Sequence, residues 1–227
     1  MLASKQGGAL LSLLIFCGLP ILFCGVPASV AAESHPGKIK AEDERCAECH
    51  GLDGNIHAPN ESAKIPKLAG QSPDYLLKQF QDFRSGERHN DFMAIMARNL
   101  DDEEVADIFA WYASQPSMKG DSSVNTDNPL GKKLYLEGDT GRGILPCAGC
   151  HGVDGKGVSQ SPSSHPQLEP ALIPVIGGQD WHYLDQQLRD WRAGVRTNSQ
   201  DGLMNKVTKQ LSDAEITALN DFISALK

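Results

Sequence analysis

Two copies of one short pattern, far apart in the chain, constrain its fold and chemistry more than any other feature. Residues 46–50 read Cys-Ala-Glu-Cys-His, and residues 147–151 read Cys-Ala-Gly-Cys-His. Two cysteines separated by two residues and followed at once by a histidine form the attachment pattern of a covalently bound haem. The two thiols bond to the porphyrin vinyl groups, and the adjacent histidine binds the iron. The expected attachment and iron-binding residues are Cys46, Cys49, His50, Cys147, Cys150 and His151.

The cysteine count supports two separate haem sites. Of the six cysteines, Cys17 and Cys24 lie in the apolar N-terminal segment, and the two motifs use the other four. A structural zinc site needs four cysteine or histidine ligands, so both pairs would have to meet on one metal across the long gap between Cys49 and Cys147. A thioredoxin-like dithiol needs a βαβ context, for which the sequence has no strand pattern. We therefore predict two covalently attached c-type haems, with zinc and a redox dithiol as the alternatives.

Residues 1–32 have the features of a secretory signal peptide. Lys5 gives the positive start, residues 10–23 form a mostly apolar run, and residues 30–32 supply the small side chains of a cleavage site. Cleavage after about Ala32 would place the mature protein in the periplasm, where haem attachment to this motif takes place. A retained anchor is the alternative, although the run is short for a membrane span and contains Pro20. No other segment is apolar enough, so we expect no membrane span in the mature chain.

Composition excludes one class of partner. The formal net charge of −8 argues against nucleic-acid binding, which needs a basic face. Aromatic residues make up only 6% of the chain, few for filling a core. A cofactor that brings its own apolar surface would allow small domains to fold with so few aromatic side chains.

An internal repeat determines the predicted architecture. Residues 65–71 read Ile-Pro-Lys-Leu-Ala-Gly-Gln, and Ile-Pro-Val-Ile-Gly-Gly-Gln follows 108 positions later. Residues 75–88 match residues 183–196 at the same offset. The haem motifs are offset by 101 positions and the last helices by 111, and such differences are small enough to lie in loops. The chain therefore contains two copies of one domain.

The repeat predicts two tandem all-α domains after the signal peptide. We expect the N-terminal domain at residues 33–116 and the C-terminal domain at residues 129–227. The segment 117–128 between them is rich in Ser, Asp, Asn and Gly, and it is the expected linker. A helix before each haem motif is also expected, at residues 35–45 and after Asn128-Pro129, and the first of these has little apolar surface.

Each copy carries the start and stop signals of helices. Capping residues stand at Ser72, Asp101, Asp180 and Ser212. Gly86 and Gly194 stand where the first helix after each Ile-Pro motif should end. Apolar residues at helical spacing follow the four caps, and we expect them in the core. They are Leu76, Phe80, Phe83, Val105, Ile108, Phe109 and Tyr112 in the first copy, and Leu184, Leu188, Trp191, Ile216, Leu219, Ile223 and Leu226 in the second.

The sixth iron ligand decides between an electron carrier and an enzyme. Met/His ligation gives a closed iron of high potential, suited to electron transfer. Met204 lies in the loop predicted between the two late helices of the second copy, and Met93 and Met96 lie in the equivalent loop of the first. Met204 precedes Leu211, just before the helix cap, by seven residues, and Met93 precedes Leu100 by the same number. We therefore expect Met93 and Met204 as ligands and Met96 as a packing residue. The histidines outside the motifs do not recur at matched positions.

With these motifs, residues 41–227 resemble the diheme class I cytochromes c of the cytochrome c4 family. The resemblance rests on features that are each present twice: Cys-x-x-Cys-His, Ile-Pro-x-(Leu/Ile)-x-Gly-Gln, a helix ending in Arg-(Ser/Ala)-Gly-x-Arg, the methionine segment and the closing helix. It implies two class I cytochrome c domains, each with histidine below and methionine above the iron. It also implies that the carbonyls of Pro66 and Pro174 orient the ligand histidines. The longer loop at residues 152–173 departs from the repeat.

The function that the resemblance implies is electron transfer without catalytic residues. Members of the family are soluble periplasmic carriers that pass electrons between respiratory components, typically toward a membrane-bound terminal oxidase. The alternative is the cytochrome subunit of an oxidoreductase complex, such as flavin-dependent sulfide dehydrogenase, with a flavoprotein as partner. A sensor or storage module is a third possibility. A catalytic haem would need an open sixth position with acid/base groups above it, and a methionine at the same place in both copies argues against that.

Overall fold

Helices supply all the regular elements of the structure, a computed structural model that describes residues 35–56, 64–122, 128–157 and 166–226. Within these residues β structure is limited to an isolated bridge between Asp139 and Ile144. The all-α prediction is confirmed. The signal peptide predicted at residues 1–32 lies outside the described residues. In the part of the chain that the structure describes, no helix has the length and apolar character needed to cross a bilayer.

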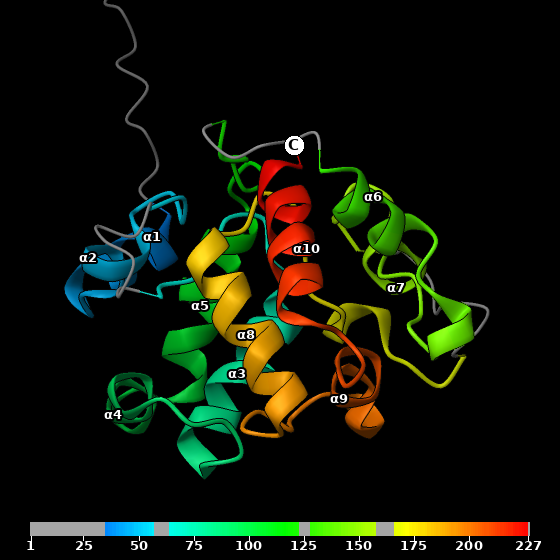
Figure 1. The fold of residues 1–227 in the computed structure, drawn as a ribbon. Coiled ribbons are helices and arrows are strands. Elements are labelled where there is room, and N and C mark those ends of the chain that lie inside the picture. Colours follow the sequence, from blue (N-terminus) through cyan, green and yellow to red (C-terminus); the bar gives the residue numbers. More distant parts are fainter. Residues whose placement is uncertain (1–34, 57–63, 123–127, 158–165, 227) are drawn as a thin grey trace, which may run out of the picture. The chain divides into compact units, whose positions relative to one another are not determined.

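The order of helices repeats along the chain (Figure 1). The first copy contains α1 (Pro36–Asp43), α2 (Cys46–His50), α3 (Pro73–Ser85), α4 (Asp91–Asn99) and α5 (Asp102–Ala113). The second copy contains α6 (Pro129–Leu136), α7 (Ala148–His151), α8 (Trp181–Ala193), α9 (Leu203–Thr208) and α10 (Asp213–Ala225). Short 3-10 turns η1 (Thr140–Arg142), η2 (Pro170–Leu172) and η3 (Gln200–Gly202) occur only in the second copy among the described residues. Both copies belong to one unit, Ser34–Lys227.

The helix ends lie where the sequence predicts them. The side chains of Ser72 and Asp180 accept hydrogen bonds from backbone N–H groups in the first turns of α3 and α8. Gly86 and Gly194 end these helices in the left-handed conformation, which glycine adopts without strain. Capping boxes open both α5 and α10.

The first helix of each copy crosses the last at a glycine. A Cβ atom on Gly37 in α1 would lie 1.8 Å from the carbonyl oxygen of Asp107 in α5. A Cβ atom on Gly131 in α6 would lie 1.9 Å from the carbonyl oxygen of Ala218 in α10. The two backbones are therefore in direct contact at both crossings. This close approach explains how α1 forms although it buries only Gly37 and Ala41.

The predicted apolar stripes form two separate cores. One is built mainly from α3 and α5, and the other from α6, α8 and α10. Twelve of the fourteen predicted core residues are buried, and Leu188 and Leu226 pack half-buried against the second core. Each copy therefore has its own hydrophobic core, as expected for two domains of one type.

One expectation was wrong, because the methionine segments predicted as loops are largely helical. Met93 and Met96 lie in α4, and Met204 lies in α9. Each helix buries a single residue, Ala97 in α4 and Thr208 in α9, so neither has a buried apolar stripe. Such short helices depend on tertiary contacts rather than on intrinsic propensity.

Candidate haem-binding sites

Both motif histidines are buried and are fixed by a proline carbonyl. The Nδ1 atom of His50 lies 2.9 Å from the carbonyl oxygen of Pro66, and that of His151 lies 3.0 Å from the carbonyl oxygen of Pro174. Since a carbonyl only accepts, Nδ1 must carry the proton, which leaves the Nε2 lone pair for a metal. Burial lowers the pKa of both histidines, opposed in part by the proline carbonyl. Both rings are therefore neutral at neutral pH, and the predicted contact to Pro66 and Pro174 is present.

The four motif cysteines are half-buried and unpaired. Burial raises the pKa of Cys46 to about 11 and that of Cys147 to about 12. Both are therefore protonated at neutral pH, whereas a redox dithiol uses a thiolate of lowered pKa. Among the described residues, no group of three or more His, Cys, Asp or Glu side chains is arranged to hold a metal ion. Neither the dithiol nor the zinc alternative has support in this geometry.

One cavity of about 770 Å³ reaches the motif residues of both copies. All four cysteines, both histidines and the three methionines of α4 and α9 line it. Large apolar side chains supply much of the remaining wall, among them Phe80, Phe83, Phe109, Leu184, Leu188 and Trp191. Such walls, with thiols, a neutral imidazole and a thioether in each copy, suit a flat apolar group with an iron centre. The residues present therefore fit a haem in each copy.

The structure places all three candidate methionines on the cavity wall, each half-buried. Counting back from the caps of α5 and α10 pairs Met93 with Met204 and Met96 with Val207. Val207 also lines the cavity and cannot bind iron. Position on the wall alone therefore does not identify a ligand, and the repeat continues to favour Met93.

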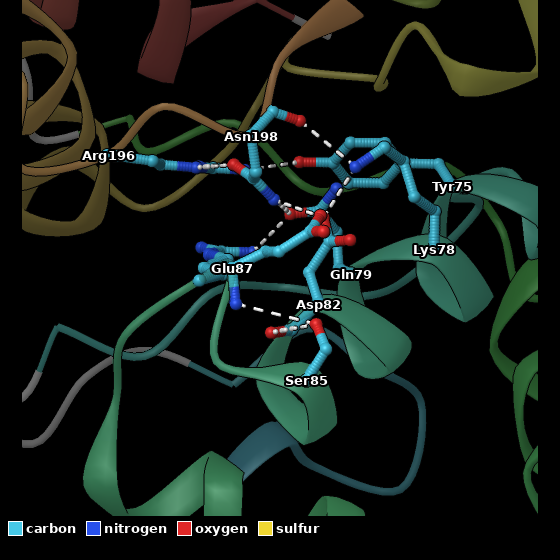
Figure 2. Close-up of polar contacts among 9 residues, drawn as sticks. Tyr75, Lys78, Gln79, Asp82, Ser85, Glu87, Arg196 and Asn198 are labelled. Atoms are coloured by element: carbon cyan, nitrogen blue, oxygen red, sulfur yellow. Dashed lines mark hydrogen bonds and ion pairs between the residues drawn. The ribbon is translucent and has the colours of Figure 1, made fainter.

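A polar contact that the sequence did not predict joins the two copies (Figure 2). Arg196 donates to the side-chain oxygen of Gln79 at 2.7 Å, and Asn198 donates to the same oxygen at 3.0 Å. In the reciprocal direction Arg88 donates to the hydroxyl of Tyr183 at 2.8 Å. Both arginines are buried and line the cavity. The repeat aligns Arg88 with Arg196. Two arginines at a matched position were the one sequence signal that could have indicated this contact between the copies.

The chain is similar to known cytochromes over most of its length. The cytochrome c family model matches residues 35–115 and 130–227. Cytochrome c4 of Pseudomonas aeruginosa is 37% identical over 218 residues, which cover 96% of this chain and 98% of the relative. A thiosulfate dehydrogenase electron acceptor of Stutzerimonas stutzeri (strain A1501) is 34% identical over 181 residues, or 79% of this chain and 77% of the relative. The crystal structure of reduced recombinant cytochrome c4 from Pseudomonas stutzeri matches with a TM-score of 0.72 and 34% identity, covering 84% of this chain and 97% of that one.

Proposed function

Because the chain belongs to the diheme cytochrome c4 family, we propose that it carries electrons in the periplasm between respiratory components, toward a membrane-bound terminal oxidase. At the coarser level the chain is a two-haem electron carrier of the cytochrome c4 type rather than an enzyme, with two cytochrome c domains in tandem and two covalent haems. The observation that carries the proposal occurs in both copies. It is a Cys-x-x-Cys-His motif whose histidine is fixed by a proline carbonyl. When bound, each haem supplies an iron that changes oxidation state by one electron.

In this proposal each copy provides a complete and closed set of ligands. Cys46 and Cys49 attach the first haem, and Cys147 and Cys150 attach the second. His50 and Met93 bind the first iron, and His151 and Met204 bind the second. The proline carbonyl that fixes Nδ1 of each neutral imidazole would orient Nε2 toward the iron, in a cavity with largely apolar walls.

The predicted signal peptide supports the proposed location of the protein. The signal peptide predicted at residues 1–32 would direct the chain to the periplasm, with cleavage after about Ala32. The donor would then be a membrane-bound respiratory complex, and the acceptor would be the oxidase.

A second candidate is an acceptor role beside a sulfur-oxidising enzyme. The observation that favours it is the relative named as a thiosulfate dehydrogenase electron acceptor. A flavoprotein such as sulfide dehydrogenase is the other partner of this class. Either enzyme would reduce the same two irons, each with both axial positions ligated. The two enzymes would differ only in the surface of the carrier that they contact.

Two measurements test the proposal. The mass of the exported protein should equal a chain starting near Glu33 plus two haems, and a redox titration with visible spectra should show two methionine-ligated irons. Membranes that contain the oxidase should reoxidise the reduced protein. A single haem or a bound zinc would contradict the proposal, and rapid reduction by purified thiosulfate dehydrogenase without oxidation by membranes would favour the second candidate.

A further inference from the structure

The glutamine that ends each Ile-Pro motif pairs with the backbone of the other copy. The side-chain oxygen of Gln179 accepts from the N–H of Lys67 at 2.7 Å, and its amide nitrogen donates to the Lys67 carbonyl at 2.9 Å. The side-chain oxygen of Gln71 accepts from the N–H of Val175 at 2.8 Å, and its nitrogen donates to the Val175 carbonyl at 2.9 Å. Both glutamines are buried, with 3% of the surface of Gln179 and 4% of that of Gln71 exposed. Each copy therefore binds the backbone N–H and carbonyl of one residue in the other copy.

In the first copy, the residue that Gln179 binds is next in the chain to Pro66, whose carbonyl contacts His50. The N–H of Lys67 and the carbonyl of Pro66 belong to the same peptide group. That carbonyl accepts the hydrogen bond from Nδ1 of His50 at 2.9 Å. A continuous path therefore runs from the ring of His50 through one peptide group to Gln179 in the second copy.

The second copy has the same path in the opposite direction. Nδ1 of His151 donates at 3.0 Å to the carbonyl of Pro174, and the N–H of that peptide group belongs to Val175. This N–H donates to Gln71 in the first copy. The two paths have the same bonds in the same order, so the arrangement is reciprocal.

Hydrogen bonds on the two sides of a peptide group reinforce each other. An acceptor at the N–H polarises the group and makes its carbonyl a stronger acceptor. A stronger acceptor at Nδ1 makes the imidazole more basic at Nε2. A more basic ligand stabilises oxidised iron relative to reduced iron and so lowers the reduction potential. Burial preserves the effect, because the local dielectric is low.

We propose that Gln71 and Gln179 are positioning residues that tune the haem of the opposite copy. Gln179 strengthens His50 as a ligand, and Gln71 strengthens His151. The inference rests on the proposed function, since it takes both histidines as iron ligands. It makes each reduction potential depend on the contact between the two domains.

A structural role alone would give a different pattern. Each glutamine stands directly before the cap of a helix in its own copy, Ser72 for α3 and Asp180 for α8. Disturbing that helix start would affect the haem of the same copy, and loosening the interface would affect both haems. Only the path through the peptide group predicts a change confined to the other copy.

The test uses the two-haem protein with Gln179→Leu and Gln71→Leu, each serving as the matched control for the other. NMR signals of the axial histidines, assigned by domain, follow the two potentials separately during a redox titration. Gln179→Leu should raise the potential of the first haem and move the Nδ1–H signal of His50 toward a weaker hydrogen bond, with the second haem unchanged. Gln71→Leu should give the mirror result. Should a leucine variant lose haem, Gln179→Asn and Gln71→Asn, which retract the amide, carry the same expectation.

Ser72→Ala is the control for both structural explanations, the helix start and the interface. It removes the cap of α3 and a bond between the copies, from the Ser72 hydroxyl to the carbonyl of Ala171 at 2.6 Å, and leaves both peptide groups paired. It should lower stability without moving the potential of the second haem, which is the potential that Gln71→Leu should move. Shifts in the same copy, equal shifts in both haems or no shift would overturn the inference. Failure of the unaltered protein to show two methionine-ligated irons would instead overturn the proposed function.

Discussion

The N-terminal and C-terminal copies differ on the helix that carries the candidate methionine. In α4, Phe92 and Ile95 are 60% and 52% exposed. Counting back from the helix caps, Leu203 and Lys206 of α9 take the same positions; Leu203 is half-buried and Lys206 is exposed. Met93 and Met204 line the cavity, together with Phe92 and Leu203, whereas the outer side of the helix carries the exposed Ile95 in α4 and the exposed Lys206 in α9. The candidate ligands are thus repeated, and the exposed surface beside them is not.

A second difference lies at the contact between the copies. Lys67 is 1% exposed, and its ammonium group donates to the carbonyls of Lys119 at 2.6 Å and Gly178 at 2.8 Å. Burial lowers the pKa of Lys67. The repeat places Val175 at the equivalent position, without a charge. The glutamine pairs are therefore symmetric in their bonds, and the charge beside them is not.

The largest expected effect tests whether the methionine positions are equivalent. Met93→Ala should remove one of two thioether–iron bands and strongly lower one haem potential, because axial ligands set haem potentials over about 0.8 V. Visible spectra during a redox titration measure both changes. Met96→Leu is the control and should leave both bands in place. The reverse result would show that the two methionine helices are not equivalent.

Substitutions at the two glycine crossings test whether the first and last helices pack equally closely in both copies. Gly37→Ala and Gly131→Ala should each lower the free energy of unfolding by about 3 kcal/mol, because the new methyl group would overlap a backbone carbonyl in α5 or α10. Denaturant unfolding of the haem-containing protein measures the loss. Gly141→Ala is the control, since its nearest non-neighbouring atom would lie 3.5 Å away. A small or one-sided loss would show that the two crossings differ.

The sequence predicted features that depend on local signals and missed those that depend on docking. The caps at Ser72 and Asp180 and the stripes behind them follow from residue type and spacing within one helix. The helix α4 was missed although Asn90 caps it, because it buries only Ala97 and its packing is tertiary, including Arg84, which donates to the carbonyl of Ala97 at 2.7 Å. The pairing of Gln179 with the other copy has no local signature. Its one available signal was a polar residue repeated at the end of an apolar motif.

A smaller effect should follow from making the outer side of α4 resemble that of α9. Ile95→Lys introduces the charge found at Lys206 and should slow electron transfer to a partner that docks on the first copy. We expect a loss of about fivefold, since 1.4 kcal/mol corresponds to tenfold and one apolar interface contact is worth about 1 kcal/mol. Stopped-flow kinetics with oxidase-containing membranes measure the rate, and both potentials should stay unchanged. Lys206→Ile is the reciprocal control, and slower transfer from that variant instead would place docking on the second copy.

The smallest effect concerns the two capping boxes, which differ in one ion pair. Glu215 in the box of α10 also bonds to Arg142, whose guanidinium chiefly lowers the pKa of that carboxyl group. Because the folded-state pKa is depressed, the stabilisation is present above the ordinary glutamate value and is lost as pH falls through the folded value. Arg142 is 44% exposed, so solvent screening keeps the loss on removing its guanidinium small. Denaturant curves of Arg142→Met should therefore show that loss at neutral pH and converge with the parent in acid. A difference that stays constant with pH would show that Arg142 acts through packing of its side chain rather than through its charge.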